Sequence, residues 1–223
     1  MERIRVEGIE SAYGKHRVLK GVSFSAEAGE GVGFVGANGC GKSTLLSILA
    51  GLKKADGGQI LFDGQKAEER LFVRYTGYVP QESNLIPELT VWDNLLLWYD
   101  DKEQLKKELT EGILPAMGIE QMRGMRVSKL SGGMHKKVSI ACALAGKPPI
   151  LLLDEPGAAL DLPGKAELRG YLAAYKAAGG TVLIATHEET DLELCDRVYA
   201  LRDGTCHEID KTFRGEELMA RLR

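Results

Sequence analysis

Cysteine and tryptophan are scarce in this 223-residue sequence. The four cysteines are scattered and form no CxxC pair, which argues against a zinc site or a disulfide framework and fits a reducing compartment. Apolar runs of the roughly 18 to 20 residues that a membrane-spanning helix needs are missing. The first residues also lack the apolar core of a secretory signal. We therefore expect a cytoplasmic chain that does not cross a bilayer by itself.

Dense blocks of basic residues are missing as well. The chain has 29 Lys and Arg against 32 Asp and Glu, for a formal net charge of −3. A protein that binds a nucleic acid backbone needs a basic footprint, so we expect no nucleic acid partner. The balance of 44% apolar and 27% charged residues is ordinary for a folded globular protein.

Two kinds of hydrophobic period indicate how the chain is organised. Alternation from Ile4 to about Ser25 predicts half-buried antiparallel strands. Between Glu82 and about Arg126 the period is helical, which indicates an inserted lobe. Elsewhere short apolar strands alternate with helices, as in a mostly parallel sheet covered by helices. We expect strands at 31–35, 59–62, 76–79, 150–153 and 181–185, with helices at 43–50, 132–144 and 163–177. The prediction is one α/β domain over 1–223 with a helical subdomain at about 82–135.

A glycine-rich segment between a predicted strand and a predicted helix carries the clearest chemistry. It matches G-x-x-x-x-G-K-[ST] and runs Gly36-Ala37-Asn38-Gly39-Cys40-Gly41-Lys42-Ser43-Thr44. Glycines let the backbone wrap tightly, so that N–H groups and the positive helix end face phosphate oxygens. We expect Lys42 to reach the β- and γ-phosphates of a nucleotide and Ser43 to bind Mg²⁺. The alternative, a fortuitous glycine-rich turn, is disfavoured by the strand and helix around the motif.

Cys40 lies inside this loop, close to a helix start. The local field there favours a thiolate, which predicts a reactive thiol that Mg-ATP protects. The alternative is a small residue that fills a tight turn.

Two carboxylates follow the apolar strand predicted at 150–153. A buried parallel strand delivers its last residues to the crevice where ligands of such sheets bind. We expect Asp154 to hold Mg²⁺ through its water shell and Glu155 to position and polarise an attacking water. Alone, an Asp-Glu pair after a strand is more often a solvated turn, but the upstream phosphate loop favours the functional interpretation.

A third element, Leu130-Ser131-Gly132-Gly133, precedes a predicted helix. A serine and two glycines at a helix start form a second anion-binding cradle, with N–H groups and a hydroxyl free to meet phosphate. One nucleotide does not need two such cradles. By itself the segment is a common loop and helix cap.

In this order and spacing, the phosphate loop, the Ser131 segment and the 150–156 segment resemble the motif set of ABC-type ATPases. The match covers the whole chain. The resemblance implies a P-loop NTPase core with a mostly parallel sheet, an N-terminal antiparallel β subdomain and an inserted α-helical subdomain. It also implies ATP and Mg²⁺ as cofactors, ATP hydrolysis, and pairing with a second copy of the chain or a homologous ATPase subunit. Ser131, Gly132 and Gly133 of one subunit then close on the ATP held by the other.

The resemblance assigns roles to four further residues, each of which has a simpler explanation. Tyr13 is similar to the aromatic residue that stacks on adenine, but it could be a surface aromatic of a strand. Gln81 resembles the glutamine that joins the Mg²⁺ and water site to the helical lobe, or it is a polar turn residue. Asp161 resembles part of the loop that crosses the dimer interface, or it caps a helix. His187 resembles the histidine that contacts the γ-phosphate and the attacking water, or it is a satisfied core histidine.

Three features depart from the family pattern. Met134 stands where glutamine is usual after Ser-Gly-Gly, and Gly157 and Ala158 replace the usual Thr-Ser or similar. These changes concern the turnover rate rather than ATP binding. As a third departure, we expect no C-terminal regulatory domain of the kind seen in some importers.

The implied role is an energy-coupling subunit that works on separate integral membrane permease subunits, peripherally on the inner face of the cell membrane. The stretch 84–95 resembles that of subunits that often serve export, while the direction stays open. A soluble ABC-type ATPase that acts as a cytoplasmic scaffold or assembly factor is the alternative. Large apolar residues of the lobe are expected to form its small core and to leave an exposed patch that docks a cytoplasmic helix; they include Leu85, Ile86, Leu89, Trp92 and Trp98.

Overall fold

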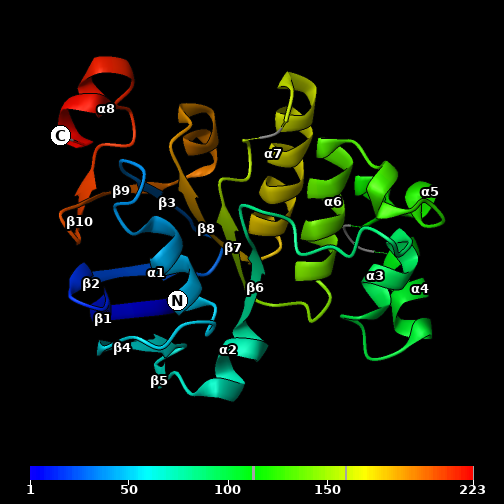
Figure 1. Cartoon of the computed structure of the whole chain (residues 1–223), viewed down its shortest axis with the longest axis horizontal. Coiled ribbons are helices and arrows are strands. Elements are labelled where there is room, and N and C mark those ends of the chain that lie inside the picture. Colours follow the sequence, from blue (N-terminus) through cyan, green and yellow to red (C-terminus); the bar gives the residue numbers. More distant parts are fainter. Residues whose placement is uncertain (112–113, 159, 223) are drawn as a thin grey trace.

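Two β-sheets form the framework of the protein, which a computed structural model describes at residues 1–111, 114–158 and 160–222 (Figure 1). The larger sheet has six strands in the order β10-β9-β3-β8-β7-β6, and all its neighbours are parallel except β10 and β9. Its strands are β3 (Gly31–Val35), β6 (Thr76–Val79), β7 (Ile150–Asp154), β8 (Thr181–Thr186), β9 (Arg197–Arg202) and β10 (Thr205–Ile209). The residues that follow β3, β6, β7 and β8 therefore meet at one edge of the sheet.

The centre of this sheet is apolar on both faces. Every residue of β3, β7 and β8 is buried, as expected for parallel strands that helices cover on both sides. The continuous apolar sequences of these strands, rather than alternating ones, are the sequence signature of this double burial. The strands predicted at 31–35, 76–79, 150–153 and 181–185 are all confirmed.

The smaller sheet is antiparallel and has the order β2-β1-β4-β5. Its strands are β1 (Glu2–Tyr13), β2 (His16–Glu27), β4 (Gly57–Phe62) and β5 (Gln65–Lys66). Helix α1 (Lys42–Leu49) packs against both sheets, because its buried leucines share one apolar cluster with residues of β1, β2, β3, β7 and β8. The helix that follows the glycine-rich loop is thus held from two sides.

A group of short helices lies beyond α7, at the right of Figure 1. It comprises α3 (Val91–Leu96), α4 (Lys102–Thr110), η1 (Pro115–Met117), α5 (Ile119–Met122), η2 (Val127–Lys129) and α6 (Gly132–Ala143). The buried Asn94 amide organises the entry to this group: it accepts from the Ile86 N–H (2.8 Å) and donates to the carbonyls of Ile86 (3.1 Å) and Thr90 (3.0 Å). Helix α6 also contacts β6, which ties the group to the parallel sheet.

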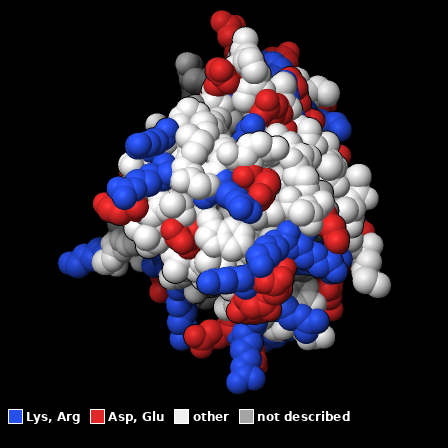
Figure 2. Space-filling model, turned by 90° about the vertical axis from the view of Figure 1, so that its right-hand side faces the viewer, with Lys and Arg blue, Asp and Glu red and all other residues white. Residues whose placement is uncertain are grey.

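The remaining helices are α2 (Glu69–Tyr75), α7 (Leu162–Ala177), η3 (Glu189–Leu194) and α8 (Gly215–Leu222). Sequence patterns did not predict α2, β9, β10 or α8. Within the described ranges, no helix combines the length and the apolar character that a membrane span requires. On the face that carries the short helices, basic and acidic side chains are interspersed rather than gathered by sign (Figure 2).

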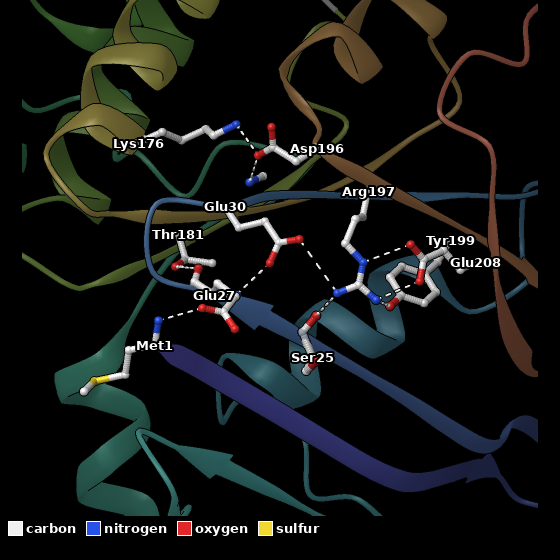
Figure 3. A network of polar contacts seen from close by, with 11 residues as sticks. Met1, Ser25, Glu27, Glu30, Lys176, Thr181, Asp196, Arg197, Tyr199 and Glu208 are labelled. Atoms are coloured by element: carbon white, nitrogen blue, oxygen red, sulfur yellow. Dashed lines mark hydrogen bonds and ion pairs between the residues drawn. The ribbon is translucent and has the colours of Figure 1, made fainter.

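A polar joint ties β2 to the parallel sheet (Figure 3). Arg197 on β9 donates two hydrogen bonds to the Glu208 carboxylate (2.9 and 2.7 Å) and a third to the Ser25 carbonyl (3.1 Å). The Thr181 hydroxyl donates to the Glu27 carbonyl at 2.7 Å. Bonds to backbone atoms of β2 thus come from both β8 and β9, so the two sheets keep one relative position around α1.

We expect Arg197→Met to lower the free energy of unfolding by about 1 kcal/mol at pH 7, because it leaves the Ser25 carbonyl without this donor. Arg197 also lowers the pKa of Glu208 below its usual 4.5. That part of the stabilisation is present above pH 4.5 and is lost as the pH falls through the lowered pKa, so the difference from wild type should shrink in acid. Urea denaturation measures both effects. Arg202→Met, on the same strand, is the matched control; equal losses for both variants would contradict the role of the joint.

Candidate functional site

The glycine-rich loop joins β3 to α1 and is shaped by close backbone packing. Gly41 caps α1 with φ of 111°, and a Cβ there would lie 2.8 Å from Leu19 Cδ2. At Gly36 a Cβ would lie 2.5 Å from the Leu201 carbonyl oxygen. Both positions therefore require glycine. Residues 37–39 between them are exposed, so the loop presents bare backbone to solvent.

Lys42 is the first residue of α1, and its side chain is buried. Its ammonium folds back over the loop, donating to the Gly36 carbonyl at 2.8 Å and to the Ala37 carbonyl at 3.4 Å. The same nitrogen lies 3.9 Å from Glu155 Oε1. Lys42 thus places a positive charge between the loop and the end of β7.

Cys40 does not behave as the helix-start argument predicts. Burial raises the pKa of its thiol, and this effect outweighs the opposing influence of the Lys42 charge. The sulfur packs close to Gly36, where a Cβ would approach it to 2.6 Å. This packing favours the alternative of a small residue that fills a tight turn over the expected reactive thiolate.

Asp154 ends β7 with its side chain 2% exposed. Burial raises its pKa, whereas a hydrogen bond from Ser43 and the charge of Lys42 lower it. The Tyr78 hydroxyl lies 3.5 Å from Oδ2, and Oδ1 is buried without a hydrogen-bond partner. A buried carboxylate oxygen costs free energy when unpaired. A serine hydroxyl beside a free carboxylate oxygen suits a hard cation such as Mg²⁺ or the water around it.

Glu155 is 5% exposed and adopts a left-handed backbone conformation, with φ of 47°. Such a conformation costs a non-glycine residue on the order of 1 kcal/mol and recurs at active sites. The turn directs the carboxylate toward His187: Oε2 lies 2.8 Å from Nδ1 and accepts from the His187 N–H at 3.3 Å. The His187 side chain is 54% exposed, so it is not a core histidine.

Lys42, Glu155 and His187 border one cleft of about 500 Å³, whereas Gly36, Cys40 and Asp154 are not among its lining residues. It is lined by Tyr13, His16, Val18, Asn38, Gly39, Gly41, Lys42, Ser43, Thr44, Gln81, Glu155 and His187. The structure therefore brings Tyr13, Gln81 and His187 to the phosphate loop, as the sequence motifs predict. His16 and Val18 were missed. The signal for His16 was its position directly across the β1–β2 turn from Tyr13.

Other predicted site residues lie elsewhere. Ser131 caps α6 by accepting from the Met134 N–H (3.3 Å), and Asp161 caps α7 by accepting from the Gly164 N–H (2.9 Å). Neither these two residues nor Gly132 and Gly133 line the cleft of their own chain. Ser131 and Gly132 are nevertheless exposed, so this helix start is open to a second molecule. Met134 packs against the apolar core.

Gly157 allows two carboxylates to approach the turn after β7. A Cβ at this position would lie 2.7 Å from Asp191 Oδ1 and 3.1 Å from Glu188 Oε2. Asp191 is buried and accepts a hydrogen bond from Thr186 at 2.7 Å, so it has little room to move. The departure from the family pattern at Gly157 therefore has a steric reason, because a larger residue would collide with these carboxylates. Their packing against Gly157 supports the segment that carries His187.

Comparison with known proteins gives one family match and several similar ATP-binding proteins. A family model described as ABC transporter matches residues 19–158. The chain is 36% identical over 207 residues to the Nod factor export ATP-binding protein I of Burkholderia orbicola (strain AU 1054), aligning 90% of this chain with 68% of that protein. It is also 36% identical over 207 residues to the probable sulfate/thiosulfate import ATP-binding protein CysA of Chlorella vulgaris, aligning 90% of this chain with 88% of that protein. Among solved structures, the dimeric post-hydrolysis state of the ATP-binding cassette MJ0796 bound to ADP and Pi matches with a TM-score of 0.81 and 29% identity, over 95% of this chain and 99% of that chain.

We expect Gly157→Ala to destabilise the protein by about 1 to 3 kcal/mol, because the added Cβ meets the fixed Asp191 carboxylate. Gly170→Ala is a matched control on α7, where a Cβ meets no atom within 4 Å. That variant should gain stability, since alanine is favoured over glycine inside a helix. Chemical denaturation of both variants checks the difference. If Gly157→Ala left the stability unchanged, the carboxylates would have moved aside at little cost, which would contradict the prediction.

Proposed function

Because the chain belongs to the ABC transporter family of ATP-binding subunits, we propose that it hydrolyses ATP as one half of a head-to-tail dimer that drives solute transport through separate integral membrane permease subunits. The observation that carries the proposal is the Lys42, Glu155 and His187 cluster, which lies beside the phosphate loop in one cleft. The relatives in the comparison are named as export and import proteins, which favours transport over the scaffold alternative.

The phosphate loop holds the triphosphate. Backbone N–H groups of the exposed segment 37–39 and of the start of α1 bind its oxygens, and the Lys42 ammonium reaches the β- and γ-phosphates. When bound, Mg²⁺ neutralises charge that develops on the phosphate oxygens. Ser43, Asp154 and Gln81 are the residues that would hold it, and the unpaired Asp154 Oδ1 is the acceptor available for its water shell.

Glu155 activates the attacking water. Its Oε2 is fixed by two contacts with His187, and its Oε1 faces Lys42. The carboxylate accepts a proton from the water as the water oxygen attacks the γ-phosphorus and the bond to the β-phosphate oxygen breaks. His187 is exposed to the cleft and contacts the γ-phosphate and the water from the end of β8.

Two further surfaces complete the proposed nucleotide site: one contacts the adenine and the other is supplied by a second copy of the chain. Tyr13 lines the cleft with its side chain 57% exposed, and this ring stacks on the adenine. The helix start at Ser131, Gly132 and Gly133 serves the nucleotide of a second copy, since Ser131 and Gly132 are exposed and all three residues lie outside the cleft of their own chain. Asp161, at the start of α7, lies in the segment that crosses this interface.

We expect Glu155→Gln to bind Mg-ATP while turnover falls by at least about 100-fold, because the amide keeps the shape of the side chain but cannot accept the proton. Size-exclusion chromatography with Mg-ATP should then show a trapped dimer, and a phosphate-release assay measures turnover. Glu193→Gln, an exposed carboxylate on η3, is the control and should retain wild-type turnover. Near-normal hydrolysis by Glu155→Gln would reject the assigned role.

A second hollow fits the proposed membrane partner. This groove of about 330 Å³ lies between α2, β6 and α6 and includes the exposed side chains of Leu52, Val73 and Trp98. Of the lobe residues expected either in its core or in the docking patch, Leu85 is buried and lines the groove, Leu89 is half-buried and Ile86 is exposed. We assign docking of a short cytoplasmic helix of a permease subunit to the rim formed by Leu52, Val73 and Trp98, whose apolar surface is open.

We expect Val73→Asp with Trp98→Asp to abolish copurification with the permease subunits, because two charges then replace apolar surface in the groove. ATP binding by the isolated chain should stay intact. Leu97→Asp is the control, since Leu97 is exposed beside Trp98 but does not line the groove. Continued copurification of the double variant would place the docking site elsewhere.

A further inference from the structure

Lys53 makes a contact with Tyr13 that the functions described so far do not use. Its ammonium nitrogen lies 4.4 Å from the centroid of the Tyr13 ring. Lys53 is half-buried, and within residues 1–111, 114–158 and 160–222 it forms no ion pair. An aromatic face attracts a cation at this distance, and the attraction is electrostatic. The charge of Lys53 is therefore directed at the ring rather than at a carboxylate.

The backbone around Lys53 is fixed at both ends. Its N–H donates to the Ser47 carbonyl in α1 at 3.2 Å. Three residues later, Asp56 accepts from the Ala12 N–H at 2.7 Å and donates its own N–H to the Glu10 carbonyl at 2.8 Å. The short segment from Lys53 to Asp56 thus connects the end of α1 to the end of β1, directly before Tyr13.

The Tyr13 ring keeps free surface beside this contact. Tyr13 lines the cleft and is 57% exposed, whereas Lys53 is not among the lining residues. The ammonium therefore contacts the ring without lining the cleft, and surface of the ring stays available to a ligand there. Without such support, an exposed tyrosine at a hairpin turn samples several rotamers, and binding must then overcome the entropy of ordering it.

We propose that Lys53 is a positioning residue for the nucleotide base: its ammonium holds the Tyr13 ring so that the free surface of the ring is presented to the base. The inference rests on the proposed function, because it takes Tyr13 as the stacking platform. One helix then links both halves of the nucleotide site. The start of α1 carries the phosphate loop, and the residues after its end orient the base platform.

The test compares a ligand that has a base with one that has none. Affinities for Mg-ADP and Mg-pyrophosphate are measured by isothermal titration calorimetry on Lys53→Met, which keeps an unbranched side chain of similar length and removes its charge. We expect about a two- to fivefold loss for Mg-ADP, the range of an exposed cation–π contact, and no change for Mg-pyrophosphate. Lys53→Arg should restore the affinity, because a guanidinium also stacks on an aromatic face. Lys54→Met is the matched control on an exposed neighbour and should equal wild type.

The outcomes separate this inference from the function on which it rests. In a Tyr13→Ala background, Lys53→Met should cause no further loss. Equal losses for both ligands would mean that Lys53 acts on the phosphates through its charge, which overturns the proposal. If Tyr13→Ala weakens Mg-ADP and Lys53→Met does not, base stacking stands and the positioning role fails. If Tyr13→Ala binds Mg-ADP as wild type does, both the stacking and the positioning role fail, while hydrolysis by Glu155 is still tested separately by Glu155→Gln.

Discussion

Burial of two adjacent carboxylates at the end of β7 is the constraint around which the site is arranged. Asp154 and Glu155 are almost inaccessible to solvent, and charges in such surroundings are costly unless other groups compensate them. The compensation comes from other elements: Lys42 and Ser43 at the start of α1, and His187 after β8. Because β7 and β8 are neighbours and β3 leads into α1, the strand order places these partners at one edge.

The same arrangement leaves the site incomplete by itself. Asp154 Oδ1 lacks a hydrogen-bond partner, and the Lys42 ammonium donates hydrogen bonds to the carbonyls of its own loop. Under the proposed function, Lys42 would exchange these carbonyls for phosphate oxygens and Asp154 would face the hydrated metal, since each pair carries complementary charges. The Lys42 charge thus suits phosphate oxygens, whereas the free Asp154 oxygen suits a cation.

The second sheet extends the site beyond the phosphate loop. It brings Tyr13, His16 and Val18 to the cleft from a hairpin that lies far from β7 in the sequence. Its position depends on the polar joint around Arg197 (Figure 3). It also depends on α1, whose apolar side chains are shared between the sheets. The Tyr13 end and the phosphate-loop end of the cleft are therefore connected through α1 rather than through a flexible linker.

Local sequence determined the strands and the chemistry of single segments. Continuous apolar runs predicted β3, β7 and β8, and the spacing of Gly36, Gly41 and Lys42 predicted the phosphate loop, because backbone conformation and strand burial depend on residues close in the chain. Only the tertiary structure decided which residues face one another. It placed His187 against Glu155, buried Leu85, raised the pKa of Cys40 through burial and set Lys53 on Tyr13. These outcomes depend on distance and solvent access between segments that are remote in sequence, and local periodicity carries no information about either.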